Sequence, residues 1–141
     1  MSKGKLIVIS GFSGAGKGTV MKELVKSDNY ALSVSATTRD PRQGEVEGES
    51  YFFKTKEQFE EMIKADALVE YACYVGNYYG TPKAFVEEKM AEGKDVLLEI
   101  EIQGALKIKE KYPDAVLIFI INDAQTVKKK VVIKNNLSFA F

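Results

Sequence analysis

Two kinds of apolar pattern alternate along this chain, and together they predict a layered α/β fold. Continuous apolar runs rich in β-branched residues are typical of strands buried on both faces of a parallel sheet. Such runs cover residues 5–10, 94–104 and 115–121. Elsewhere, apolar residues recur every three or four positions, as on the buried face of a helix. These helical patterns cover residues 17–27, 55–65, 81–93 and 104–113. Strands that alternate with helices predict a parallel sheet at the core of the fold.

The middle of the chain interrupts this alternation with short strands and turns. Strands are expected at 31–38, 51–53 and 68–80, the last broken by a turn at Gly76-Asn77. Thr55, three residues before Gln58, forms a capping-box pattern that predicts the start of a helix. We therefore expect residues 34–81 to form a lobe inserted into an α/β core made of residues 1–33 and 82–121.

The end of the chain, residues 122–141, differs from the rest. It contains three consecutive lysines and has weak periodicity. A lysine run is typical of a solvated face or tail. We therefore interpret this segment as an atypical C-terminal tail.

Composition narrows the class of protein. A chain of 141 residues with 45% hydrophobic residues can form one domain with a sizeable core. Twenty acidic and twenty basic residues cancel, so no global charge favours a nucleic-acid or membrane partner. The N-terminal apolar run is only about five residues, shorter than the core of a signal peptide. The single cysteine, Cys73, cannot form an internal disulfide. These features predict a cytoplasmic protein.

The stretch "GFSGAGKGT" lies between the first predicted strand and the first predicted helix. It matches G-x-x-x-x-G-K, in which glycine backbone N–H groups surround phosphate oxygens and the lysine reaches the outer phosphates. The candidate ATP-binding residues are Gly11, Phe12, Ser13, Gly14, Ala15, Gly16, Lys17, Gly18 and Thr19. Gly18 replaces the usual hydroxyl residue, and Thr19 offers a hydroxyl one position later as a magnesium ligand. The alternative is a glycine-rich turn that binds nothing.

Two acidic residues follow the apolar run "VLL". Glu99 and Glu101 are two positions apart, which on a strand directs both carboxylates to the same side. Ligands of open α/β sheets bind at the carboxyl ends of the strands. The pair is therefore a candidate magnesium site together with Thr19, although an exposed surface pair is the alternative.

Arginine is confined to one place in the chain. Arg39 and Arg42 are its only arginines, and both lie in "TTRDPRQGE". Two arginines across a turn can hold a phosphate or a carboxylate, and a solvated turn is the alternative.

The segment "SATTRDPRQGEVEGESYFF" resembles the signature of the guanylate kinase family. The matching residues are Thr37, Thr38, Arg39, Arg42, Glu45, Gly48, Tyr51 and Phe53. "GNYYGT" and "EIQG" are similar to further blocks of that family, in the same order, and the resemblance covers roughly residues 5 to 120. It implies a P-loop nucleoside monophosphate kinase fold with an inserted GMP-binding lobe. It also implies magnesium-dependent transfer of a phosphoryl group from ATP to GMP.

The resemblance further implies a role for each residue of the site. Lys17, Arg39 and Arg42 would be catalytic. The residues that it assigns to GMP are Ser35, Arg39, Arg42, Tyr51, Glu70, Tyr79, Thr81, Glu99 and Glu101. Of these, Arg39, Arg42, Tyr51 and Tyr79 would hold the phosphate, and Ser35, Glu70 and Thr81 would face the guanine base. Taken singly, the alternatives are a surface glutamate for Glu70 and a core tyrosine for Tyr79.

The chain also departs from that family. Guanylate kinases resembling it carry an arginine-rich lid over the ATP phosphates, but no arginine follows Arg42 here. The hypothesis at this point is a shortened guanylate kinase, produced by an internal deletion or a shifted reading frame. Two alternatives remain open: a catalytically inactive module that binds GMP or a peptide, and a kinase for another base.

Overall fold

The computed structural model describes residues 2–11, 17–122 and 129–134. The chain forms two compact units. The core unit comprises Met1–Leu32 and Lys89–Phe141, and the inserted unit comprises Ser33–Glu88. Each unit has its own sheet.

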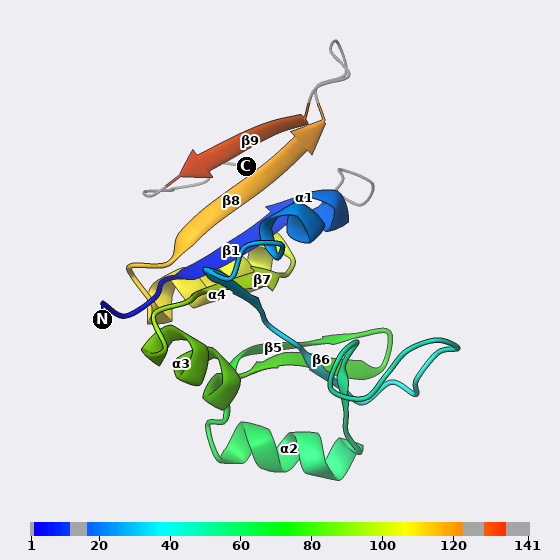
Figure 1. The fold of residues 1–141 in the computed structure, drawn as a ribbon. Coiled ribbons are helices and arrows are strands. Elements are labelled where there is room, and N and C mark those ends of the chain that lie inside the picture. The colour runs from blue at the N-terminus through cyan, green and yellow to red at the C-terminus, as the bar shows by residue number, and fades with distance from the viewer. Residues whose placement is uncertain (1, 12–16, 123–128, 135–141) are drawn as a thin grey trace. The chain divides into compact units, whose positions relative to one another are not determined.

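The core unit is built on a five-stranded sheet with the order β2-β7-β1-β8-β9 (Figure 1). Its strands are β1 (Leu6–Gly11), β2 (Tyr30–Leu32), β7 (Asp95–Glu99), β8 (Val116–Asn122) and β9 (Lys129–Lys134). The first four are parallel, and β9 runs antiparallel to β8. The predicted α/β class with a parallel core is confirmed.

The strand at the centre of this sheet is buried, as its apolar sequence predicted. Val8 and Ile9 of β1 are fully buried. Ile9 packs with Leu97 of β7, Ile120 of β8 and Met21 of α1 (Lys17–Leu24). Helix α4 (Ile102–Lys111) contributes Ala105 and Ile108 to the buried residues. Helices packed on the sheet explain why the strands are continuous apolar runs rather than alternating ones.

The inserted unit contains a four-stranded mixed sheet with the order β4-β3-β6-β5. Its elements are β3 (Ala36–Thr37), β4 (Phe52–Phe53), α2 (Lys56–Lys64), β5 (Leu68–Tyr74) and β6 (Asn77–Pro82), with the start of α3 (Lys83–Ala91). Strands β5 and β6 form a hairpin whose turn residues, Val75 and Gly76, both have positive φ. The turn therefore lies one residue before the predicted Gly76-Asn77, and Val75 adopts a conformation that valine rarely takes.

Helix α2 covers one face of this second sheet. The predicted capping box is confirmed: the Gln58 N–H donates to the Thr55 hydroxyl, and the Thr55 N–H donates to the Gln58 side chain. Phe59 is fully buried, and its ring stacks on Tyr78 with 4.9 Å between centroids. Ala36 and Leu68 complete this small core. Because side chains alternate along a strand, the neighbours of Ala36 and Tyr78 point to the opposite face.

Two predicted elements differ from the structure. The expected strand at 31–38 is two strands, β2 in the core sheet and β3 in the second sheet. A continuous run of small and β-branched residues does not reveal where the chain leaves one sheet for another. Two lysines of the run near the C-terminus, Lys129 and Lys130, begin β9, which pairs along β8 from Lys129↔Asn122 to Lys134↔Leu117. The segment was predicted to be a tail because of its lysines, although the centre of the strand, residues 131–133, is apolar. Among the described residues, no helix is both long and apolar enough to cross a membrane.

Candidate nucleotide-binding site

The glycine-rich stretch lies between the carboxyl end of β1 and the first turn of α1. At Gly11 an added Cβ would be 2.6 Å from the Ile120 carbonyl oxygen, so only glycine allows β1 and β8 to approach this closely. Phe12, Ser13, Gly14, Ala15 and Gly16 lie outside the described residues. Lys17 begins α1 and is half-buried, and Gly18 and Thr19 are exposed on its first turn. The predicted strand and helix are therefore both present, and α1 begins within the stretch, at Lys17.

The two candidate magnesium ligands lie at the carboxyl end of β7. Glu99 is the last residue of that strand, and its Cα pairs with Ile9 of β1. The prediction that Glu101 continues this strand is wrong. Glu101 is the N-cap of α4, so the two side chains do not share one strand face. The hydrogen bond from the Ile100 N–H to the Ile9 carbonyl lies between the end of β7 and the start of α4.

This arrangement fits a weakly held divalent cation better than a protein cage. Glu99 and Glu101 are both exposed, and Glu101 makes no side-chain capping hydrogen bond. Among the described residues, no group of three or more acidic, cysteine or histidine side chains could hold a metal ion. Magnesium in phosphate-transfer sites uses one or two carboxylates together with phosphates and waters. The donor set therefore fits magnesium that is bound mainly through a nucleotide.

The Arg39 guanidinium in the inserted unit is held by hydrogen bonds to Glu45 and Asp40. Its Nη1 and Nη2 donate to Glu45 Oε2 and Oε1 at 3.1 and 2.9 Å, and Nη1 also donates to the Asp40 carbonyl at 2.9 Å. The two side chains are 14% and 21% exposed. A bidentate pair of this kind fixes both the position and the plane of the guanidinium.

Two tyrosines surround the same guanidinium. The Arg39 Cζ lies 5.2 Å from the centre of the Tyr51 ring, and the rings of Tyr51 and Tyr79 meet edge to face with 6.2 Å between centroids. The hydrogen bond to Glu45 raises the pKa of Arg39 above its usual value, with further contributions from Tyr79 and Tyr51. The same pairing, together with the Arg42 N–H, lowers the pKa of Glu45. Arg39, Tyr51 and Tyr79, which the resemblance assigns together to a phosphate, therefore lie next to one another.

Arg42 lies on the same turn with a different exposure. Its backbone N–H donates to Glu45 Oε2 at 2.8 Å, while the residue itself is exposed. The turn thus holds one arginine firmly and leaves the other at the surface.

The residues predicted to face a base lie on β3, β5 and β6 or beside them. The Thr81 hydroxyl, in a fully buried residue, donates to Glu70 Oε1 at 3.2 Å. Ser35 immediately precedes Ala36, and its carbonyl accepts from the Phe52 N–H. Because Ala36 pairs with Gly80, Ser35 lies beside Thr81 across the two strands.

Most of these residues share one face of the second sheet. Tyr79 and Thr81 alternate with Tyr78 and Gly80 along β6, and the Tyr78 ring packs on α2. Tyr79 and Thr81 therefore point away from α2. The Glu70 carboxylate reaches Thr81 on that face, and Arg39 and Tyr51 gather around Tyr79. One sheet face thus presents a cationic cluster beside a carboxylate–hydroxyl pair.

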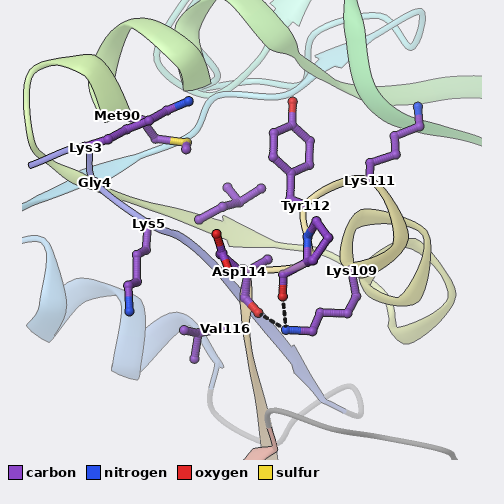
Figure 2. A pocket seen from close by; sticks show the side chains of 12 residues that line it. Lys3, Gly4, Lys5, Met90, Lys109, Lys111, Tyr112, Asp114 and Val116 are labelled. Atoms are coloured by element: carbon purple, nitrogen blue, oxygen red, sulfur yellow. Dashed lines mark hydrogen bonds between the residues drawn. The ribbon is translucent and has the colours of Figure 1, made fainter.

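A separate cavity of about 610 Å³ lies at the amino ends of β1 and β8 in the core unit. Its lining includes Lys3, Lys5, Lys109 and Lys111. Figure 2 shows these lysine side chains extending in different directions, and Lys109 Nζ donates to the Pro113 and Ala115 carbonyls. The cavity therefore lacks convergent charge and lies at the opposite end of β1 from the glycine-rich stretch.

Comparison with known proteins decides the family. The family model for guanylate kinase matches residues 3–138. The chain belongs to the guanylate kinase family. It is 56% identical over 134 residues to a guanylate kinase of Clostridium tetani, a match that covers 95% of this chain and 64% of the relative. It is 59% identical over 120 residues to one of Halalkalibacterium halodurans, with 84% and 59% coverage.

A solved structure supports the same assignment. The crystal structure of guanylate kinase from Anaplasma phagocytophilum matches with a TM-score of 0.71 at 36% identity, covering 84% of this chain and 60% of that one. The architecture, a parallel core sheet with a separate mixed sheet, is therefore the guanylate kinase fold. The chain spans roughly three fifths of the length of these guanylate kinases.

Sequence reasoning did not give Glu45 a role. It was matched only as an acidic position of the guanylate kinase signature, six residues after Arg39. The spacing is the feature of the sequence that could have indicated this role. When a short turn containing glycine separates an arginine from an acidic residue, the two side chains can form an ion pair across the turn. The Gly44 φ of 85° is the feature that makes this return possible.

Gly80 tests the packing on the opposite face of the second sheet, the face that α2 covers. A Cβ at Gly80 would lie 3.0 Å from the Glu70 carbonyl oxygen and 3.0 Å from the Phe59 ring. Gly80→Ala is therefore expected to lower the free energy of unfolding by about 1–3 kcal/mol, measured by urea denaturation. Gly18→Ala is the control, because none of the described residues lies within 4 Å of its Cβ position, and it is expected to leave stability unchanged or raised. Equal stability of the two variants would contradict the close packing.

Proposed function

We propose that this chain binds ATP and GMP and transfers the terminal phosphoryl group of ATP to GMP, giving ADP and GDP. The observation that carries the proposal is the shared sheet face of the inserted unit, where the Arg39 cluster stands beside the Glu70–Thr81 pair. Tyr79 and Thr81 are two residues apart on β6, so their Cα atoms are separated by roughly 7 Å. A phosphate group and a base edge of one mononucleotide can reach both places.

The cationic cluster is suited to the phosphate of GMP. The Arg39 guanidinium supplies charge and parallel N–H donors, and the Tyr51 and Tyr79 hydroxyls supply neutral donors. Arg42, exposed on the same turn, adds a second positive charge. Arginine suits this task because its planar donor edge matches two phosphate oxygens.

The carboxylate–hydroxyl pair is suited to guanine. Guanine presents two adjacent donors, N1–H and the exocyclic amine, which match the two oxygens of one carboxylate. Adenine offers no such adjacent pair at the corresponding edge. Thr81 holds Glu70 by a hydrogen bond, and Ser35 lies beside Thr81. Glu70 is therefore the proposed specificity residue for the base.

ATP is assigned to the glycine-rich stretch of the core unit. Lys17 at the start of α1 would bind the outer phosphates, aided by the positive end of the helix. Gly11, Gly18 and Thr19 flank residues 12–16 in this proposal. Glu99, Glu101 and Thr19 would hold magnesium, which when bound neutralises phosphate charge during transfer.

The transfer itself needs no covalent enzyme intermediate. A phosphate oxygen of GMP attacks the γ-phosphorus of ATP, and the bond from that phosphorus to the β–γ bridging oxygen breaks as ADP leaves. The contribution of the side chains is positioning and positive charge, because charge is spread over the equatorial oxygens in the transition state. Lys17 and Arg39 are the proposed sources of that charge.

A coupled assay that measures ADP formation from ATP and GMP tests the activity. Turnover that requires GMP, ATP and magnesium together is the expected result. GMP binding without turnover would instead support a second function, a GMP-binding module without catalysis.

The base assignment has its own test. Glu70→Gln replaces one acceptor oxygen by a donor while keeping the size of the side chain, and should weaken GMP binding about 10- to 100-fold. AMP binding should change little, so discrimination between the two nucleotides falls. Calorimetric titration of both nucleotides measures this, with Glu60→Gln on α2 as the matched control. Unchanged discrimination in Glu70→Gln would remove Glu70 from the base site.

A cytoplasmic setting is part of the same proposal. Cys73 is a free and exposed thiol, which fits a reducing compartment.

A further inference from the structure

We propose that Glu45 is a positioning residue for the phosphate site: it holds Arg39 by one edge and leaves the other edge for the phosphate of GMP. This inference rests on the proposed function for the ligand and on the geometry of the 39–45 turn for the mechanism. Glu45 itself is not assigned to contact the nucleotide. Its effect passes through Arg39.

The hydrogen bonds of Arg39 divide its guanidinium into two edges. A guanidinium has five N–H groups. Glu45 takes one from Nη1 and one from Nη2, and the Asp40 carbonyl takes the second from Nη1. Glu45 and Asp40 leave the Nε–H and the outer Nη2–H, which are parallel and form the side-on edge of the group, and Tyr79 and Tyr51 also hydrogen-bond to this guanidinium. Two parallel donors match two oxygens of a phosphate.

The Glu45 carboxylate is itself fixed in place. The Glu45 N–H donates to the Arg42 carbonyl at 3.0 Å, and the Arg42 N–H donates back to Glu45 Oε2 at 2.8 Å. Gly44, at the third position of this four-residue turn, has the positive φ that a type II turn requires there. Backbone and side chain of Glu45 are thus both held by the turn. An ordinary surface ion pair lacks this anchoring and orders little.

Other groups complete the orientation. The Tyr51 ring lies under the guanidinium with 5.2 Å from its centre to Cζ, and the Tyr79 and Tyr51 side chains also interact with the same group. Three donor-bearing side chains therefore gather where the phosphate is proposed to bind. Glu45 adds a negative charge at this place, which by charge alone repels a phosphate.

That repulsion makes the inference testable, because the two possible roles have opposite signs. If Glu45 only balances charge, Glu45→Gln removes a repulsion and tightens GMP binding. If Glu45 positions Arg39, the same change weakens GMP binding about 10- to 100-fold, because a donor displaced by about 1 Å loses its geometry. Calorimetric titration with GMP measures the sign. Glu49→Gln, exposed in the same segment, is the control and should bind GMP as the unaltered chain does.

A second readout follows Arg39 without any nucleotide. The chain has only two arginines, so ¹⁵N-arginine NMR gives two guanidinium groups to follow. We expect slow rotation of the Arg39 Nη groups in the unaltered chain and fast rotation for Arg42. In Glu45→Gln the Arg39 signals should average as those of Arg42 do. Glu45→Asp, which keeps the charge but shortens the reach, should also weaken GMP binding.

The outcomes separate this inference from the proposed function. Slow Arg39 rotation in a chain that binds no GMP would overturn the phosphate-site role of Glu45 together with the proposed function, while leaving the Glu45–Arg39 pair intact. GMP binding by the unaltered chain that is unchanged or tightened in Glu45→Gln would overturn the inference alone. Weakened binding together with averaged Arg39 signals supports it.

Discussion

Arg39→Ala is expected to weaken GMP binding by about 100-fold or more. The change removes the only arginine that is held in place in the inserted unit and leaves Glu45 without its partner. Truncating one member of a hydrogen-bonded charge pair removes a contact and also leaves the other charge without its partner. Because Glu45 would then present an uncompensated negative charge to the phosphate, the loss exceeds that of a simple missing contact. Calorimetric titration of GMP measures it.

Two further variants separate the loss of charge in Arg39→Ala from the loss of the bidentate geometry. Lys56→Ala removes a positive charge from an exposed position at the start of α2 and should leave GMP binding within about twofold. Arg39→Lys keeps the charge but cannot make the bidentate pair, so it should recover only part of the affinity. Unaltered GMP affinity in Arg39→Ala would contradict the phosphate site.

Lys17→Ala is expected to lower ATP-dependent phosphorylation of GMP by about 100- to 1000-fold while leaving the Kd for GMP nearly unchanged. Removing one positioned charge or donor from a transition state has an effect of this size. Lys17 begins α1 in the core unit, whereas the residues assigned to the GMP phosphate and base lie in the inserted unit. The coupled assay gives the rate, and calorimetry gives the affinities for ATP and for GMP.

The matched control for Lys17 lies on the same helix. Lys22→Ala removes an equal charge from an exposed position of α1 and should retain the turnover of the unaltered chain. Wild-type turnover in Lys17→Ala would exclude the glycine-rich stretch as the ATP site. A parallel loss of GMP affinity would show that the two nucleotides are not held independently.

The core unit was largely predictable from the pattern of apolar residues. Strands such as β1 and β7 are buried on both faces, so their sequences are continuous apolar runs bounded by glycine or acidic residues. The boundary between the two sheets was not predictable. Leu32 and Ala36 lie in one unbroken strand-like run, yet they belong to different sheets, because tertiary packing and not local propensity decides where the chain crosses.

The residues of the candidate site were only partly predictable from the sequence. Arg39 and Tyr51 were predicted through a spaced signature and Tyr79 through a second block of the same family, and the structure brings them together. The partner of Arg39 was not predicted, since pairing with Glu45 depends on the turn at Gly44 and its backbone hydrogen bonds. The position of Glu101 was wrong for a similar reason. The strand spacing of the two acids holds only while the strand continues, and here a helix begins after Glu101.

The most direct test of the account is a calorimetric comparison of GMP and AMP binding to this chain without ATP. The account predicts that GMP binds and that AMP binds at least about 100-fold more weakly, because two adjacent donors meet Glu70 in one case and not in the other. Equal affinity for the two nucleotides, or no binding of GMP, would contradict it.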